Sequence, residues 1–103
     1  MKIYDLIISD AAFSMLDGHI SFLANVSETA AYNTMNVILD SIEALKENPE
    51  RYPYYENTFI PHGRYRKMVC ARRYLVIYEV SDHTVCVDYI VDCRQGHEWM
   101  IVY

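Results

Sequence analysis

Hydrophobic and polar side chains alternate over three successive runs in the last third of the chain. The runs cover residues 64–70, 73–80 and 84–93 and are rich in Val, Ile, Tyr and Cys. Alternation of these residue types is typical of β-strands that have one buried face. Only residues 71–72 and 81–83 separate the runs. Connections this short join antiparallel neighbours, so the pattern predicts a three-strand meander.

The same alternation assigns a face to each side chain of the meander. One face collects aromatic and β-branched residues and is expected to be the core face: Tyr74, Val76, Tyr78, Val80, Val85, Val87, Tyr89 and Val91. The other face mixes apolar and charged residues and is expected to stay open: Arg64, Arg66, Met68, Arg73, Leu75, Ile77, Glu79, Cys86, Asp88, Ile90, Asp92 and Arg94. On this face Met68, Leu75, Ile77 and Ile90 would form an exposed apolar patch, which usually marks a partner-binding surface.

The first half of the chain has the spacing of one strand and two helices. Residues 3–9 form a short apolar run, and Ser9 or Asp10 can cap a helix behind it. Apolar residues then recur in two helical stripes, at Phe13, Leu16, Ile20 and Leu23 and at Ala31, Met35, Ile38, Ile42 and Leu45. The second helix is expected over residues 27–48, because Pro49 disfavours helix at the residue before it. The short connection predicts an antiparallel helix hairpin packed on the core face of the meander, an α+β fold.

Residues 50–63 are predicted to form a loop, because Pro53, Pro61 and Gly63 interrupt them. The loop carries four aromatic side chains, at Tyr52, Tyr54, Tyr55 and Phe59. These rings either pack over the open end of the core or form a stacking platform for nucleotide bases.

Composition limits the class of protein. A chain of 103 residues with 52% hydrophobic residues is expected to fold as one globular domain. No apolar run is long enough to span a membrane, and the first residues do not resemble a signal peptide. Three cysteines without a paired spacing fit the reducing cytoplasm better than a disulfide framework, and they argue against a zinc site. The common nucleotide-binding and metal-binding motifs are missing, so no cofactor is expected.

The basic residues are unevenly distributed in a chain whose net charge is −5. Five of them gather around the first break in the meander with no acid among them, and we call them the basic arm: Arg64, Arg66, Lys67, Arg72 and Arg73. A local basic patch on an acidic protein favours a specific anionic target over general attraction to polyanions. A basic arm also protects an exposed sheet edge from unwanted pairing, which is a structural use of the same residues.

Four segments, taken in this order, resemble the RelE/ParE superfamily of bacterial toxins: LKENPERYP at 45–53, YRKM at 65–68, YLVIYEV at 74–80 and VDYIVDCRQ at 87–95. The resemblance covers nearly the whole chain and is carried mainly by the C-terminal third. It implies a small cytoplasmic toxin of a type II toxin–antitoxin module, neutralised by a cognate antitoxin. RelE-like members cut mRNA in the ribosomal A site, whereas ParE-like members inhibit DNA gyrase.

The resemblance to RelE-like members implies a set of site residues. Their RNA cleavage needs no metal, because the 2′-OH attacks the adjacent phosphate with help from a base, a cation and an acid. Arg66 and Arg94 fall where RelE-like enzymes carry basic residues, and His97 falls in the region that supplies an acid or base. Trp99, in the same region, is a candidate for stacking on a base. Contacts to nucleic acid or to the partner are expected from the rest of the basic arm: Arg64, Lys67, Arg72 and Arg73.

Four residues depart from the RelE-like pattern. Leu75 occupies a position where RelE-like nucleases have an arginine, and Met68 one where they have another basic residue. The carboxylates of Asp88 and Asp92 are expected on the open face, where they would compete with a phosphate for the arginines. The function predicted from the sequence is a RelE-like mRNA endonuclease, and two alternatives stay open: a ParE-like inhibitor of gyrase, or a non-toxic protein-binding member. All three predict an antitoxin-type partner.

Overall fold

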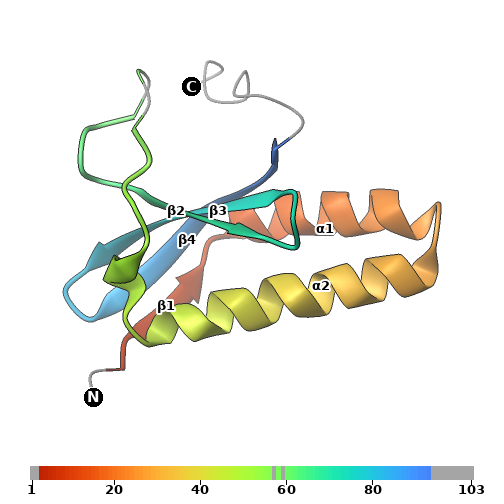
Figure 1. Cartoon of the computed structure of the whole chain (residues 1–103), viewed down its shortest axis with the longest axis horizontal. Helices are drawn as coiled ribbons and strands as arrows, with labels where there is room; N and C mark the ends of the chain where they lie inside the picture. Colours follow the sequence, from red (N-terminus) through yellow and green to blue (C-terminus); the bar gives the residue numbers. More distant parts are fainter. Residues whose placement is uncertain (1–2, 57, 59, 94–103) are drawn as a thin grey trace.

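Figure 1 shows a four-stranded sheet with two helices lying side by side along it. The computed structural model describes residues 3–56, 58 and 60–93. The elements in chain order are β1 (Asp5–Ile8), α1 (Asp10–Ala24), α2 (Glu28–Glu43), the short 3-10 helices η1 (Ala44–Lys46) and η2 (Pro49–Arg51), β2 (Arg66–Cys70), β3 (Tyr74–Ser81) and β4 (Thr84–Asp92). The predicted α+β class, with an N-terminal strand, a helix hairpin and a meander, is confirmed.

The strand order in the sheet is β1-β4-β3-β2. β2, β3 and β4 form the predicted antiparallel meander, and β1 pairs with β4 in parallel. A parallel pair needs a long crossover, and here the connection includes the helix hairpin and the first strands of the meander. The hairpin covers one face of the sheet, which we call the helix face, and the opposite face is called the open face.

The main hydrophobic core lies between the hairpin and the helix face. Its buried members come from both helices, all three meander strands, η1 and the residue before β1: Tyr4, Ala12, Leu16, Ile38, Ile42, Leu45, Met68, Cys70, Tyr74, Val76, Tyr78, Val85, Val87 and Ile90. The helical stripes predicted from the sequence supply Leu16, Ile38 and Ile42 to this core, whereas Phe13 is 51% exposed. Burial of these apolar side chains is the main favourable contribution to folding.

A β-bulge in β4 changes which face its side chains occupy. Val87 lies opposite Tyr78 and Tyr89 lies opposite Ile77, so Asp88 has no partner in the β3–β4 register. An unpaired residue reverses the alternation beyond it. Val85 and Val87 therefore share the helix face with Ile90. The predicted placement of Ile90 on the open face, and of Tyr89 and Val91 on the core face, is wrong for this reason.

β2 also presents the face opposite to the one predicted. Met68 lies opposite Val76 and Cys70 opposite Tyr74, and all four side chains are buried in the core under the helices. Residues directly opposite in an antiparallel pair share a face. Arg66, which lies opposite Tyr78, is therefore on the helix face, and its predicted place on the open face is wrong, as is that of Met68.

The open face is partly covered by the loop between η2 and β2. Residues 53–55 run alongside β2, with Lys67 N donating to Pro53 O at 3.1 Å and Tyr55 N donating to Tyr65 O at 2.7 Å. A second buried cluster forms under this loop: Tyr55, Tyr65, Leu75, Ile77 and Val91. The packing of loop aromatics that the sequence suggested is confirmed for Tyr55, and Phe59 lies outside the described residues.

The expected exposed patch is therefore absent from the described part of the open face. Met68 and Ile90 are buried under the helices, and Leu75 and Ile77 are buried under the loop. Leu75 is the most exposed of the four at 7%. The patch prediction is wrong because it treated the strands as a regular alternation and left out the loop.

The predicted second helix is shorter than residues 27–48. α2 ends at Glu43 and is followed by η1 and η2, with Asn48 in the left-handed region at φ 55°. The buried Tyr78 hydroxyl donates to Pro49 O at 2.6 Å and fixes the start of η2 against β3. None of the helices in the described ranges is long and apolar enough to cross a lipid bilayer.

Gly18 lies in the middle of α1 without a steric reason inside the chain. A Cβ built at this position would meet no other atom within 4 Å. Glycine in a helix interior is about 1 kcal/mol less favourable than alanine. The packing of the described residues therefore does not explain why α1 carries a glycine here.

α1 covers the part of the β4 edge that β1 leaves unpaired. β1 ends at Ile8, and Ser9 then donates from its backbone N to Val87 O at 2.9 Å and from Oγ to Asp88 O at 3.3 Å. Further along α1, His19 Nε2 donates to Ile90 O at 2.8 Å. Edge carbonyls that would otherwise need another strand are satisfied in this way.

We expect Ser9→Ala to destabilise the protein more than Ser27→Ala. Both serines cap a helix, accepting from Ala12 N at 3.0 Å and from Ala30 N at 3.1 Å, but only Ser9 also binds the β4 edge. Loss of a cap costs about 1 kcal/mol, and the added bond makes the expected loss at Ser9 roughly 2 kcal/mol. Urea denaturation measures both, and equal losses would contradict the edge role of Ser9.

Candidate functional site

Arg66, the first predicted catalytic residue, is engaged with the chain's own backbone. Its Nη1 donates to Tyr52 O at 2.6 Å and to Glu50 O at 3.0 Å. The guanidinium also lies 4.1 Å from the centre of the Tyr54 ring, within cation–π range. These contacts attach the η2 turn and the start of the loop to β2. The geometry makes Arg66 a structural clamp on the helix face.

The other members of the basic arm do not form one cationic surface. Arg64 Nε lies 3.1 Å from Glu79 Oε2, and the bond to this carboxylate raises the pKa of Arg64. Arg73 Nη2 lies 2.8 Å from Asp92 Oδ2. Lys67 Nζ lies 5.7 Å from the centre of the Tyr55 ring on the open face. Arg72 is exposed in the β2–β3 turn at φ 69°. Arg64, Arg66 and Arg73 are each engaged by different groups of the chain, so these three cations do not act together.

The C-terminal members of the predicted site lie outside the described residues. They are Arg94, His97 and Trp99. Their roles, and their proximity to Arg66, stay predictions. Among the described residues, no group of three or more His, Cys, Asp or Glu side chains is arranged to hold a metal ion.

A shallow apolar hollow lies on the open face, between the loop and the strands. Its volume is about 460 Å³, and we call it the open-face hollow; it is lined by Tyr52, Pro53, Tyr55, Lys67, Val69, Leu75, Val91, Asp92 and Cys93. Val69 is 61% exposed beside it. An apolar concavity with one cationic side chain at its wall is suited to an apolar group of a partner molecule.

The sequence predicts other roles for some of the residues that line this hollow. Lys67 was predicted as a contact residue and Leu75 as part of the apolar patch, and both line the hollow. Val69 was missed because β2 was assigned the reverse alternation. Its signal was present in the sequence, since Lys67 and Val69 are as consistent a strand face as Arg66 and Met68.

The part of the open face next to the bulge is acidic and closely bonded. Cys86 Sγ donates to Asp88 Oδ1 at 3.3 Å, and burial together with this bond raises the pKa of Cys86 to about 11. Burial and a hydrogen bond to Asp88 also raise the pKa of Tyr65 above its usual range. Glu79, paired with Arg64, adds a second carboxylate. A phosphate would be repelled by these carboxylates on this part of the sheet.

The comparison with solved structures supports the fold described above. A chain of the structure described as "Chromosomal ParDE TA system from P. aeruginosa" superimposes with a TM-score of 0.72 and 13% sequence identity. The match covers 87% of this chain and 96% of the other. At this identity the likeness establishes the fold alone, and it confirms the RelE/ParE-like arrangement predicted from the sequence. No protein-family model matches the sequence, and no match is found among the curated proteins.

We expect Arg66→Ala to lower the free energy of unfolding by about 2 kcal/mol, because hydrogen bonds from a charged donor contribute about 1.5–3 kcal/mol. Arg66→Lys should recover part of this loss, since an ammonium can reach one carbonyl but not both with the same geometry. Arg64→Ala is the matched control and should change stability little, because its ion pair is at the surface. Urea denaturation of the three variants checks the clamp, and an Arg66→Ala protein as stable as the wild type would contradict it.

We expect stability to fall as pH rises above 9. The usual pKa of a thiol is 9.0, and burial raises the pKa of Cys70 and of Cys86 to about 11. Between these values the unfolded chain releases thiol protons that the folded chain retains, so alkali favours unfolding. Urea denaturation at pH 8 and pH 10.5 measures the fall. Cys70→Ala should reduce it, and an unchanged fall in this variant would contradict the assignment to Cys70.

Proposed function

We propose that this chain is the toxin of a toxin–antitoxin pair. The observation that carries the proposal is the fold, which matches a chain of a ParDE system over 87% of this chain and 96% of the other. The ordered segments that resemble RelE/ParE toxins in sequence support it independently. A cognate antitoxin is the partner that follows from this function, and the cytoplasm is the compartment in which such a toxin acts.

We further propose that the toxin acts by binding a protein target rather than by cutting RNA. Arg66 is occupied by two backbone carbonyls on the helix face, away from the predicted phosphate site. The open face next to the bulge carries Asp88 and Glu79, which disfavour a polyanion. ParE-like inhibition of DNA gyrase is the form of protein binding that the sequence resemblance offers.

The open-face hollow is the surface that we assign to the target. It combines an exposed valine, Val69, with the aromatic wall of Tyr55 and the cation Lys67. Aromatic and aliphatic anchors with few charged residues beside them are typical of the centre of a protein–protein interface. Target binding here does not require any of the cations that are paired inside the chain.

Induced expression in a bacterial host is expected to arrest growth. In a translation extract, primer extension should find mRNA intact, whereas purified protein should inhibit supercoiling by DNA gyrase. Val69→Glu should raise the amount of protein needed for growth arrest at least about tenfold, because a carboxylate would be desolvated in the interface. Val37→Glu is the matched control, since Val37 is also an exposed valine but lies on α2 at 47% exposure; it should arrest growth like the wild type.

Three results would count against this function. Growth that continues during expression rejects the toxin assignment itself. Cleaved mRNA in the extract, lost in a His97→Ala variant, assigns the RelE-like endonuclease reaction instead. Equal growth arrest by the Val69→Glu and Val37→Glu variants would mean that the hollow is not part of the target interface.

A further inference from the structure

The outer edge of β2 is open beside the open-face hollow. The loop that pairs with this edge stops at Pro53, whose carbonyl accepts from Lys67 N at 3.1 Å. Proline has no N–H, so the loop donates nothing further to β2 at this position. Val69 is two residues along the strand, so its N–H and C=O point to the same outer side. No backbone hydrogen bond from the described residues reaches these two groups, and they are available to an added strand.

The C-terminal residues 94–103 follow directly from the hollow. Cys93 lines the hollow, and its N donates to Arg73 O at 2.7 Å, which fixes the point where this segment begins. The sequence of the segment is a polar part with one glycine, RQGHE, followed by an uncharged part, WMIVY. We call residues 99–103 the apolar tail. Aromatic and β-branched residues of this kind favour a strand, and they gain free energy when an apolar surface covers them.

The length of the polar part is sufficient to bring the apolar tail to β2. β4, β3 and β2 are successive neighbours in the sheet, so a position outside β2 is about 14 Å from β4. The chain from Cys93 to Trp99 spans up to about 20 Å when it is extended. β2 and β4 run in the same direction, since both are antiparallel to β3. A tail that turns back from the end of β4 therefore runs antiparallel to β2.

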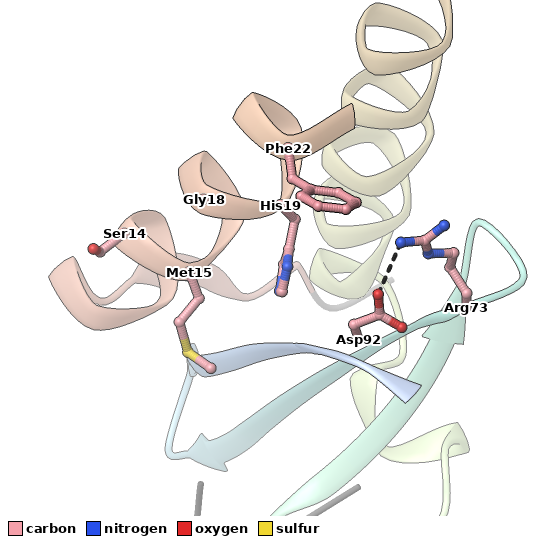
Figure 2. Close-up of a pocket in the computed structure, with 7 residues that line it drawn as sticks. All are labelled: Ser14, Met15, Gly18, His19, Phe22, Arg73 and Asp92. Carbon is pink, nitrogen blue, oxygen red and sulfur yellow. Dashed lines mark hydrogen bonds and ion pairs between the residues drawn. The ribbon is translucent and has the colours of Figure 1, made fainter. Parts of the chain in front are cut away.

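A second concave surface also begins at the end of β4, on the side of α1. Its volume is about 650 Å³, and we call it the α1 groove; Figure 2 shows residues that line it, among them Met15, His19, Phe22, Arg73 and Asp92. Its strand edge is already bonded, because His19 Nε2 donates to Ile90 O at 2.8 Å. One end of it carries the ion pair between Arg73 and Asp92. The β2 edge, with unpaired backbone groups beside an apolar wall, suits the tail better.

We propose that the apolar tail adds to the outer edge of β2 as a short strand, with Ile101 opposite Val69 and with Trp99 over the open-face hollow. Residues that lie opposite each other in an antiparallel pair share a face. Ile101 is therefore on the open face with Val69, and Trp99, two residues away, is on the same face. The Val69 side chain, 61% exposed in the described part of the chain, becomes covered.

The docking itself does not depend on the proposed function, whereas its consequence does. The open-face hollow is the surface that we assigned to the target, so the tail has to leave it before the target binds. Ile101→Glu should therefore lower the amount of protein needed for growth arrest. A chain that does not arrest growth but protects Trp99 keeps the docking and loses the toxin assignment.

The first test uses fluorescence of the full chain, in which Trp99 is the only tryptophan. In the wild type, emission should lie at short wavelength and acrylamide should quench it weakly, because the docked ring is shielded from water. Val69→Glu should raise the quenching constant at least about twofold, since docking would bury an unpaired carboxylate. Val37→Glu is the matched control, an exposed valine on α2, and should leave the constant unchanged. Circular dichroism checks that both variants fold.

The second test examines the register of the added strand. Cα atoms of a hydrogen-bonded antiparallel pair are about 5.5 Å apart, which is within the range of a disulfide. A chain with Val69→Cys and Ile101→Cys should therefore form this bond under mild oxidation. Peptide mapping distinguishes it from a bond to the native Cys93. A chain with Val37→Cys and Ile101→Cys is the control and should not form the corresponding bond.

Four results would overturn the proposal. The first is quenching of Trp99 in the folded wild type that equals quenching in urea, and the second is equal quenching in the Val69→Glu and Val37→Glu variants. The third is a Phe22→Ala variant that exposes Trp99 when Val69→Glu does not, which places the tail in the α1 groove. The fourth is protection of Trp99 only at concentrations where the chain sediments as a dimer, which places the tail on a second copy.

Discussion

The unpaired Asp88 in β4 determines how the rest of the structure is arranged. Before it, Val87 faces the helices, and beyond it the alternation is reversed, so Ile90 faces the helices and Val91 faces away. Both hydrophobic clusters depend on this reversal, because Ile90 belongs to the core under the helices and Val91 to the cluster under the loop. The bulge also lies where β1 ends and α1 begins to cover the edge of β4, with Ser9 bound to the carbonyl of Asp88. Helix packing and sheet pairing are thus joined at one irregular residue.

The second constraint is the internal use of the cations. Arg66 binds carbonyls of the η2 segment, and through this segment and Tyr54 it fixes the loop that covers the open face. Arg73 is paired with a carboxylate that is 6% exposed. Charged groups held in this way have their hydrogen bonds satisfied within the fold and are less available to a phosphate. The sequence shows a basic cluster, but in the structure Arg66 binds backbone carbonyls, whereas Arg64 and Arg73 pair with two different carboxylates.

Much of the fold could be predicted from local patterns. The face of the sheet on which each side chain lies could not. The meander, the helix hairpin and the core role of Tyr74 and Val76 follow from alternation and spacing. The face of β2 was ambiguous because both of its alternations contain a cation and an aliphatic residue. The bulge has no local signal, since Asp88 stands in an otherwise regular run of alternating residues. The position of the loop over the open face depends on the pairing of Tyr54 with Arg66, a contact between segments that are distant in sequence. The predicted site failed at Arg66 for these reasons, and its remaining members, Arg94 and His97, lie beyond the described part of the chain.

The α1 groove and the open-face hollow are separate surfaces that meet at Asp92. Asp92 is buried and bound to Arg73 at the end of β4, so it is a fixed boundary and not a moving part. The two surfaces are therefore separated by an ion pair that belongs to the fold. Met15 and Phe22 lie on one side of this pair, and Val69 and Leu75 lie on the other.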